Sequence, residues 1–202
     1  MRTGQLPERP AFPSWGLPGE DSARAEGESL VGGQSLMTRL ALRAARARKL
    51  APGAELRLRN VASGLAADTA SPAPELWVST RPERNALVCG GKHPVIAVTR
   101  SLLAGSSRTE LEAVLAHCLV RFGRGDSARA LRALARGPFG RPPAVGYEDD
   151  VLTAALTRYP PALVRALRSA EPVEGRYGPL WFVSSEPSHR SVPGRIAALK
   201  DL

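Results

Sequence analysis

The amino-acid sequence predicts an α+β fold in which helices pack on a small antiparallel sheet. Two observations indicate this class. Strand patterns gather in residues 55–99 and helical patterns dominate from Ser107 onward, and such segregation is typical of α+β domains. Hydrophobic residues also make up 43% of the 202-residue chain, which is enough for one packed core. Because aromatic residues are only 5%, we expect Ala, Val and Leu to fill that core.

The chain divides into an N-terminal arm, residues 1–33, and one domain, residues 34–202. The arm is rich in Pro, Gly and charged residues, so we expect it to be disordered. It also lacks the apolar run of a signal peptide. Ser35 then opens a helical pattern that continues to Leu50, and Pro52-Gly53 ends it.

Strand patterns follow in four segments, which are Glu55–Val61, Glu75–Thr80, Asn85–Cys89 and Pro94–Thr99. The first alternates leucines with arginines, as a half-exposed strand does. The last is almost entirely apolar, so we expect it to be buried. A late strand is predicted at Pro179–Ser184.

The best-defined helix begins at Ser107, since Ser107 and Glu110 have the spacing of a capping box. Apolar residues recur at helical spacing after it, and Gly123 ends the helix. Four more helices are predicted, at Ser127–Arg136, Asp149–Thr157, Pro161–Ser169 and Val192–Leu202, with a proline-rich loop at Gly137–Gly146.

The bulk properties narrow the class of partner. The formal net charge is +9, yet the basic residues are spread along the chain, and only Lys49, Lys92 and Lys200 are lysines. An arginine bias of this kind also fits GC-rich codon usage, and no nucleic-acid readout motif is present, so binding to nucleic acid is not the favoured function. Two cysteines cannot form a disulfide framework, and no apolar run is long enough to span a membrane. We therefore expect a cytoplasmic protein with no membrane span.

The segment from Asn85 to Asp126 carries the most informative motifs. It reads NALVCGGKHPVIAVTRSLLAGSSRTELEAVLAHCLVRFGRGD and resembles the HtpX-like zinc metallopeptidases, metallopeptidase family 48. In that family an N-A-F strand precedes a V-V-V-T-x-G-L-L strand and turn, an E-L-x-A-V-x-A-H-E-x-x-H helix and a nearby Asp. The matching positions are Asn85-Ala86, Thr99, Leu102-Leu103, Glu110-Leu111, Ala113-Val114, Ala116-His117 and Asp126.

The resemblance extends over roughly Glu55 to Leu202. YEDDVLTAALTRYPPALVRALRS is similar to the family's E-x-x-x-D helix and the helix after it, and SHRSVPGRIAALKDL is similar to its T-H-P-P-x-x-x-R-I-x-x-L tail. The resemblance implies a zincin-like metallopeptidase domain. It also implies a site in which two histidines at i and i+4 and a later Glu bind Zn²⁺, while the Glu after the first histidine serves as general base.

This sequence departs from that site at three of four positions. His117 stands at the first histidine, Cys118 at the general base, Arg121 at the second histidine and Gly146 at the third ligand. Of the three ligand positions only His117 is competent, because a guanidinium repels a divalent cation and Gly146 has no ligand atom. Cys118 does not replace the carboxylate base, since a thiol has an ordinary pKa of about 8.5. We therefore expect no catalytic residue and no metal site of the family type, unless zinc binds an altered site.

Other assignments of these residues are weaker. Cys118 could be a nucleophile paired with His117, but adjacent helical residues diverge by about 100°. A new metal site made of Cys89, His93, His117 and Cys118 lacks accepted ligand spacing. The favoured interpretation is a core-facing imidazole beside a small buried thiol.

Two further expectations concern the surroundings of His117. We expect Arg121 to fill the space of the metal and to pair with Glu148 or Asp150, against the alternative of a solvated arginine at a helix end. The resemblance places Asn85 and Ala86 at the edge of a peptide groove, which could still accept an extended peptide by strand addition.

The sequence as a whole predicts a catalytically degenerate metallopeptidase-like protein that acts as a binding or regulatory module through the former substrate groove. Its partner would be a peptide or protein segment. One alternative is an active zinc metalloendopeptidase with a non-standard site. The other is a basic protein that binds nucleic acid or an acidic partner.

Overall fold

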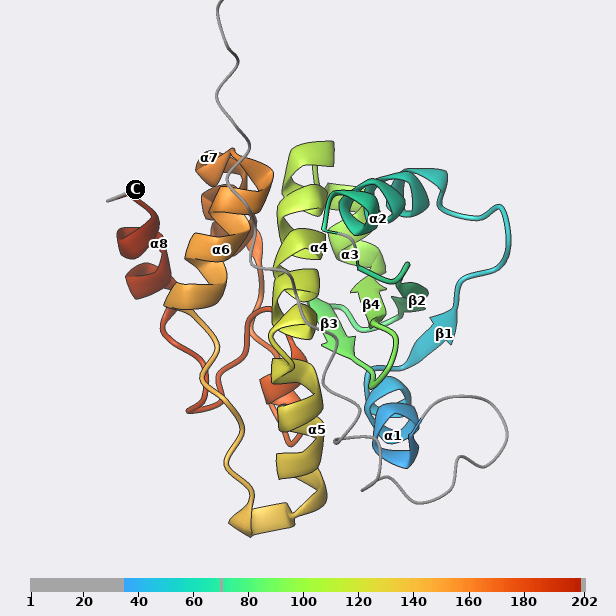
Figure 1. Ribbon diagram of the computed structural model, residues 1–202, viewed down its shortest axis with the longest axis vertical. Helices are drawn as coiled ribbons and strands as arrows, with labels where there is room; N and C mark the ends of the chain where they lie inside the picture. The colour runs from blue at the N-terminus through green and yellow to red at the C-terminus, as the bar shows by residue number, and fades with distance from the viewer. Residues whose placement is uncertain (1–34, 70, 201–202) are drawn as a thin grey trace, which may run out of the picture.

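The computed structural model describes residues 35–69 and 71–200, and the predicted arm, residues 1–33, lies outside them. Figure 1 shows the arrangement of the elements. Along the chain they are α1 (Leu36–Ala44), β1 (Ala47–Lys49), α2 (Leu56–Asp68), β2 (Glu75–Ser79), β3 (Ala86–Cys89), β4 (Val95–Thr99), α3 (Arg100–Gly105), α4 (Arg108–Gly123), α5 (Asp126–Ala135), η2 (Gly137–Phe139), α6 (Tyr147–Thr157), α7 (Pro160–Ser169), η3 (Gly178–Leu180) and α8 (Val192–Lys200). The α+β class predicted from the sequence is confirmed.

The four strands form one mixed sheet in the order β1-β2-β4-β3. β1 pairs with β2 and β3 with β4 in antiparallel fashion, but β2 and β4 are parallel, so the prediction of an antiparallel sheet is wrong for this pair. The chain passes from β2 to the sheet edge as β3 and returns into the middle as β4. Every residue of β4 is buried, which explains why this apolar strand takes a central place.

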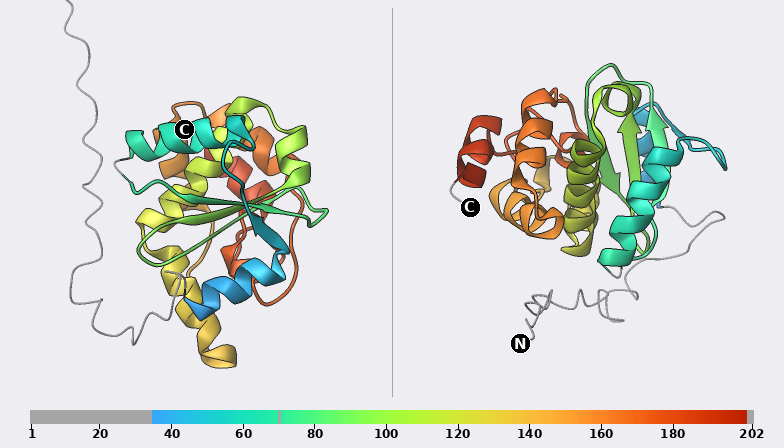
Figure 2. Two further views of the ribbon diagram at one scale, coloured as in Figure 1. Left: turned by 90° about the vertical axis from the view of Figure 1, so that its right-hand side faces the viewer. Right: turned by 90° about the horizontal axis from the view of Figure 1, so that it is seen from above.

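Helix α4 is the central helix of the domain and contacts α2, α6, α7 and strand β3. Figure 2 shows the layers, with α8 outermost, then α6 and α7, then α4 and the sheet. The predicted capping box is confirmed, because Ser107 Oγ accepts from the Glu110 amide at 3.2 Å and the Glu110 carboxylate accepts from the Ser107 amide at 2.8 Å. The domain is thus built around the helix that carries His117.

Three predicted elements differ in the structure. The segment predicted as a strand at Glu55–Val61 is the start of helix α2, because the buried residues Leu58, Val61, Ala62, Leu65 and Ala66 recur at helical spacing over a longer window. Helix α1 starts at Ser35 as predicted, but it ends at Ala44 and the chain continues as β1. Residues 179–184 are not a regular strand: a 3₁₀ turn is followed by isolated bridges of Trp181 and Ser184.

Candidate functional site

His117 lies on the part of α4 that faces α6 and the C-terminal segment. Its side chain is fully buried, and its ring meets the ring of Phe182 edge to face at a centroid distance of 4.9 Å. Nδ1 lies 3.5 Å from Asp150 Oδ1, and among the described residues neither ring nitrogen has a hydrogen-bond partner. Burial, together with the nearby Arg195 and Arg121, holds the pKa of His117 well below its ordinary value. The imidazole is therefore neutral.

Asp150 and Arg195 form a buried ion pair next to His117. Arg195 Nε donates to Asp150 Oδ2 and Arg195 Nη2 to Asp150 Oδ1, both at 2.7 Å, and both side chains are fully buried. The third contact of Arg195 is from Nη1 to Phe182 O at 2.9 Å. This bidentate pair joins α6 to α8 across the site. In the sequence Arg195 is recognisable only as part of the R-I-x-x-L tail, and no local pattern indicates its pairing with Asp150.

Arg121 fills the position of the second histidine with a guanidinium that is 1% exposed. Nη2 donates to Pro179 O at 2.7 Å and Nη1 to Trp181 O at 3.3 Å. Burial lowers the pKa of Arg121, while Asp149 opposes this effect.

The structure does not bring Arg121 into the predicted pairing with Glu148 or Asp150. Asp150 is paired with Arg195, and Glu148, whose side chain is 78% exposed, is paired with Arg124 at 2.6 Å. Positions 148 and 150 point to different sides of α6, because successive helical residues are about 100° apart. Arg121 is buried as expected, but its two Nη atoms bind backbone carbonyls instead of a carboxylate, and its buried Nε has no hydrogen-bond partner among the described residues.

Cys118 faces the main hydrophobic core and is 1% exposed. Burial raises the pKa of its thiol to about 12, with a smaller opposing effect of Arg121. Cys89 is buried in the second core cluster, whereas His93 is exposed in the loop between β3 and β4. Within the described ranges no three His, Cys, Asp or Glu side chains gather in a way that suits a metal.

Gly146 precedes the first turn of α6, and its amide donates to Asp149 Oδ2 at 3.3 Å. A Cβ atom added to Gly146 would lie 2.6 Å from Arg190 Cγ and 2.8 Å from Arg190 Cβ. Arg190 is held there because its amide donates to Val145 O at 2.9 Å. The space for a side chain at position 146 is thus already taken.

The donors around His117 do not fit a zinc ion. Zinc needs about three protein ligands in a tetrahedral arrangement, and here one neutral imidazole is accompanied by two buried guanidinium groups, Arg121 and Arg195. Those cations would raise the energy of a divalent ion in this place. We therefore derive no reaction through a metal.

Asn85 and Ala86 lie where β3 begins, at the edge of the sheet. Asn85 is fully buried, and its Nδ2 donates to Glu171 O and to Val183 O, both at 2.7 Å. Ala86 O accepts from the amide of Phe182 at 2.8 Å. This edge of β3 is therefore paired with the chain's own residues 181–183.

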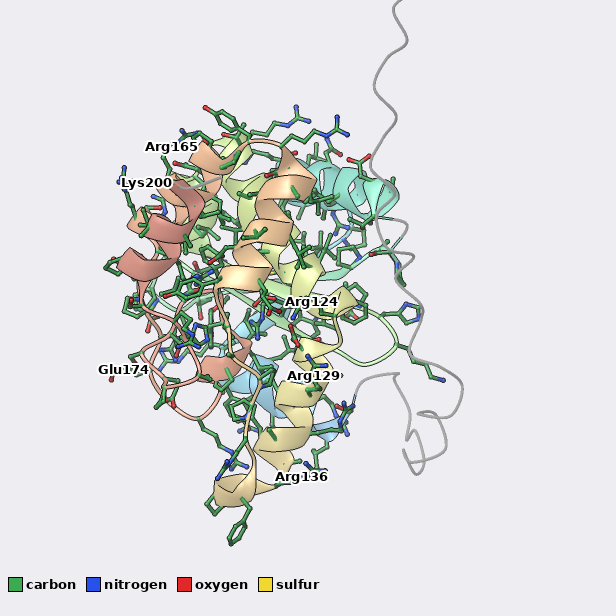
Figure 3. The ribbon with its side chains drawn as sticks, turned by 60° about the vertical axis from the view of Figure 1, so that its left-hand side comes forward. Arg124, Arg129, Arg136, Arg165, Glu174 and Lys200 are labelled. Atoms are coloured by element: carbon green, nitrogen blue, oxygen red, sulfur yellow. The ribbon has the colours of Figure 1, made fainter. Side chains whose placement is uncertain are left out.

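Charged side chains surround a surface hollow of about 300 Å³ beside Gly146. Asp126 accepts from Arg124 at 3.2 Å and from Arg129, and Arg124 also contacts Glu148. Figure 3 shows Arg124 and Arg129 close together where α4 meets α5. Because carboxylates and guanidinium groups alternate here, the hollow favours neither an anion nor a cation.

Comparison with known proteins supports the resemblance seen in the motifs. The model of peptidase family M48 matches residues 52–134, from the turn before α2 to near the end of α5. No curated protein gives a significant match. None of the helices in residues 35–69 and 71–200 combines the length and the apolar character that a membrane span requires. Over residues 52–134, which include α4, the α+β domain is therefore similar to the zincin-like domain of peptidase family M48.

Proposed function

We propose that this M48-like protein does not cleave peptides and instead acts as a binding or regulatory module. The observation that carries the proposal is Arg121, whose buried guanidinium stands at the position of a metal-binding histidine and is engaged by two carbonyl groups. A fixed cation in this place is incompatible with Zn²⁺ at the same point. No step of a hydrolytic reaction then has a metal-bound water to use.

Cys118 supports the same conclusion at the position of the general base. With its pKa raised to about 12 by burial, the thiol stays protonated near neutral pH and takes up no proton from water. The thiol packs in the main core, and adjacent helical residues diverge by about 100°, so we do not assign the two groups as a nucleophile and base.

The partner we propose is a peptide or protein segment. An extended segment that used the former groove would have to replace residues 181–183 at the edge of β3. A reducing compartment such as the cytoplasm suits the chain, because both cysteines are free and buried.

Metal analysis and a peptidase assay on the purified full chain test the proposal. We expect less than about 0.1 zinc per chain and no cleavage of casein, since one imidazole alone is a weak zinc site. A Cys118→Glu/Arg121→His variant serves as the matched comparison, because it provides two imidazoles at i and i+4 and removes the cation. It should bind zinc more tightly than the wild type.

About one zinc ion per wild-type chain, with casein cleavage that a chelator abolishes, would show instead an active zinc metallopeptidase with a non-standard site.

A further inference from the structure

Residues 181–183 extend the sheet beyond β3. Phe182 N donates to Ala86 O at 2.8 Å, and Trp181 forms an antiparallel bridge with Leu87. The side chain of Asn85 continues this pairing, because its Nδ2 donates to Val183 O at 2.7 Å and its Oδ1 accepts from Val183 N at 3.3 Å. An extended peptide adds to a free sheet edge with the same kind of contacts.

The carbonyl groups of this segment are bound by two buried arginines. Arg121 holds Pro179 O at 2.7 Å and Trp181 O at 3.3 Å, and Arg195 holds Phe182 O at 2.9 Å. All of these contacts are made to backbone atoms. The arginines thus hold the segment through its main chain, whatever its side chains.

The side chains of the segment are enclosed on both sides of the sheet edge. Phe182 packs with the main core, against His117 and under the guanidinium of Arg195 at 5.1 Å, whereas Trp181 belongs to the second core cluster. Leu180, Trp181, Phe182 and Val183 are each at most 3% exposed. Leu180 and Trp181 pack in the second cluster and Phe182 and Val183 in the main one, so the segment is enclosed by both clusters.

We propose that residues 179–183 are a built-in occupant of the peptide groove, an autoinhibitory segment that Arg121 keeps in place. The inference rests on the proposed function, since it describes how the groove of a non-proteolytic protein is closed. An external extended peptide is then excluded from the β3 edge by the chain itself. Restoring the residues of the H-E-x-x-H motif would leave residues 179–183 in place at the β3 edge.

Amide hydrogen exchange on the full chain, followed residue by residue by NMR, tests the role of Arg121. In the wild type we expect the Phe182 and Val183 amides to be protected like those of β4. In an Arg121→Gln variant these two amides should exchange at least about tenfold faster, because their segment loses its bonds to the guanidinium. The matched control is Arg124→Gln at the C-cap of α4, whose guanidinium binds Asp126 and Glu148 instead of the segment, and it should leave both rates unchanged.

A peptide added in trans tests the groove itself. A labelled peptide of the sequence GPLWFVS, residues 178–184, should not bind the wild type. It should bind a Trp181→Gly/Phe182→Gly variant, whose own segment has lost its anchoring side chains, and a scrambled peptide should not. Equal binding to wild type and variant, or no binding to the folded variant, would overturn the proposal.

If the double variant does not fold, the hydrogen-exchange experiment still tests the proposal. An unprotected Phe182 amide in the folded wild type would overturn it. Zinc content measured on the same samples separates the two conclusions. A zinc-loaded wild type with a protected Phe182 would refute the proposed function but leave the groove occupied.

Discussion

At the scale of single residues, the pair of Asp150 and Arg195 is the strongest polar link in the site. Its two 2.7 Å bonds are fully buried, and Arg195 carries the link on to Phe182 O. A buried pair of this kind adds less stability than its Coulomb energy suggests, because both charges have lost their water. Removal of one partner, however, leaves the other charge buried without compensation.

Asp150→Asn should therefore destabilise the domain by about 3–5 kcal/mol, measured as the free energy of unfolding in urea. Glu148→Gln is the matched control on the same helix turn, since its 78% exposed carboxylate pairs only with Arg124. That change should cost less than about 1 kcal/mol. Equal losses in the two variants would contradict the assignment of Asp150 as the buried anchor.

The buried His117 and the half-buried His189 make the stability depend on pH. Burial, together with Arg121 and Arg195, lowers the pKa of His189 to about 3 from an ordinary value of 6.5, and the pKa of His117 is also well below 6.5. Below pH 6.5 the unfolded chain takes up protons that the folded chain refuses. The contribution of neutral histidine is therefore complete above pH 6.5 and is lost as the pH falls toward 3.

His189→Gln should flatten the fall in unfolding free energy between pH 6.5 and 4 by up to about 1.4 kcal/mol per pH unit. Glutamine keeps a donor for Gly178 O, which His189 Nε2 contacts at 3.1 Å, but it does not titrate. Urea unfolding at several pH values measures the slope. A His93→Gln variant, changed at an exposed loop position, is the comparison, and an identical slope in both variants would contradict the prediction.

At the scale of elements, the start of helix α4 is the best-explained local structure. The reciprocal bonds of Ser107 and Glu110 satisfy two amides that no helix hydrogen bond can reach. Because α4 also carries His117 and Arg121, the cap at its start stabilises the helix that positions both residues.

Ser107→Ala should cost about 1 kcal/mol of unfolding free energy, since it removes the acceptor for the Glu110 amide. Thermal unfolding of the variant measures the loss. Arg108→Ala, a change at the exposed next position, should have little effect. A Ser107→Ala variant as stable as the wild type would show that the capping box does not contribute.

Long apolar patterns predicted the helices well, but short alternating ones did not. The pattern of Leu56, Arg57, Leu58 and Arg59 suits a strand over four residues, yet the buried positions of α2 extend to Ala66 at helical spacing. The helical spacing prevails over the short alternating pattern because a helix buries more apolar surface of this segment against α4. The strand predicted at Pro179–Ser184 is a similar case. Trp181 and Phe182 are buried, as in a strand, but the bridges of this segment are isolated ones.

The site was predictable in its positions but not in its contacts. The resemblance to the H-E-x-x-H motif puts His117 and Arg121 on one helix, and both lie on α4, but it left open whether Arg121 is buried or solvated. Its partners, Pro179 O and Trp181 O, lie about 60 residues away in the sequence. Carbonyl groups leave no side-chain signal, so no pattern of charges could have indicated them.

At the scale of the whole molecule, the net charge of +9 is less available to a partner than its size suggests. Arg81, Arg124 and Arg129 are paired with Glu83, Glu148 and Asp126, and Arg121 and Arg195 are buried. Arg124 and Arg129, together with Arg190, line the surface hollow beside Gly146, but they share it with Asp126, Glu148 and Asp149.

Double-stranded DNA should therefore bind only weakly, with a dissociation constant of about 10⁻⁵ M or higher at physiological salt and no preference between sequences. Fluorescence anisotropy with two unrelated duplexes of equal length, at several salt concentrations, measures this. A preference of more than about tenfold for one duplex would favour the nucleic-acid alternative.

The contact between Gly146 and Arg190 bears on the history of the site. A ligand at position 146 needs a Cβ atom, and that atom would lie 2.6 Å from Arg190 Cγ. A single substitution at Gly146 therefore meets a steric penalty before it gains any metal-binding advantage. With Arg121 still in place, that advantage would in any case be absent. A ligand at position 146 therefore has to come together with a change at Arg190 and with the loss of the Arg121 guanidinium.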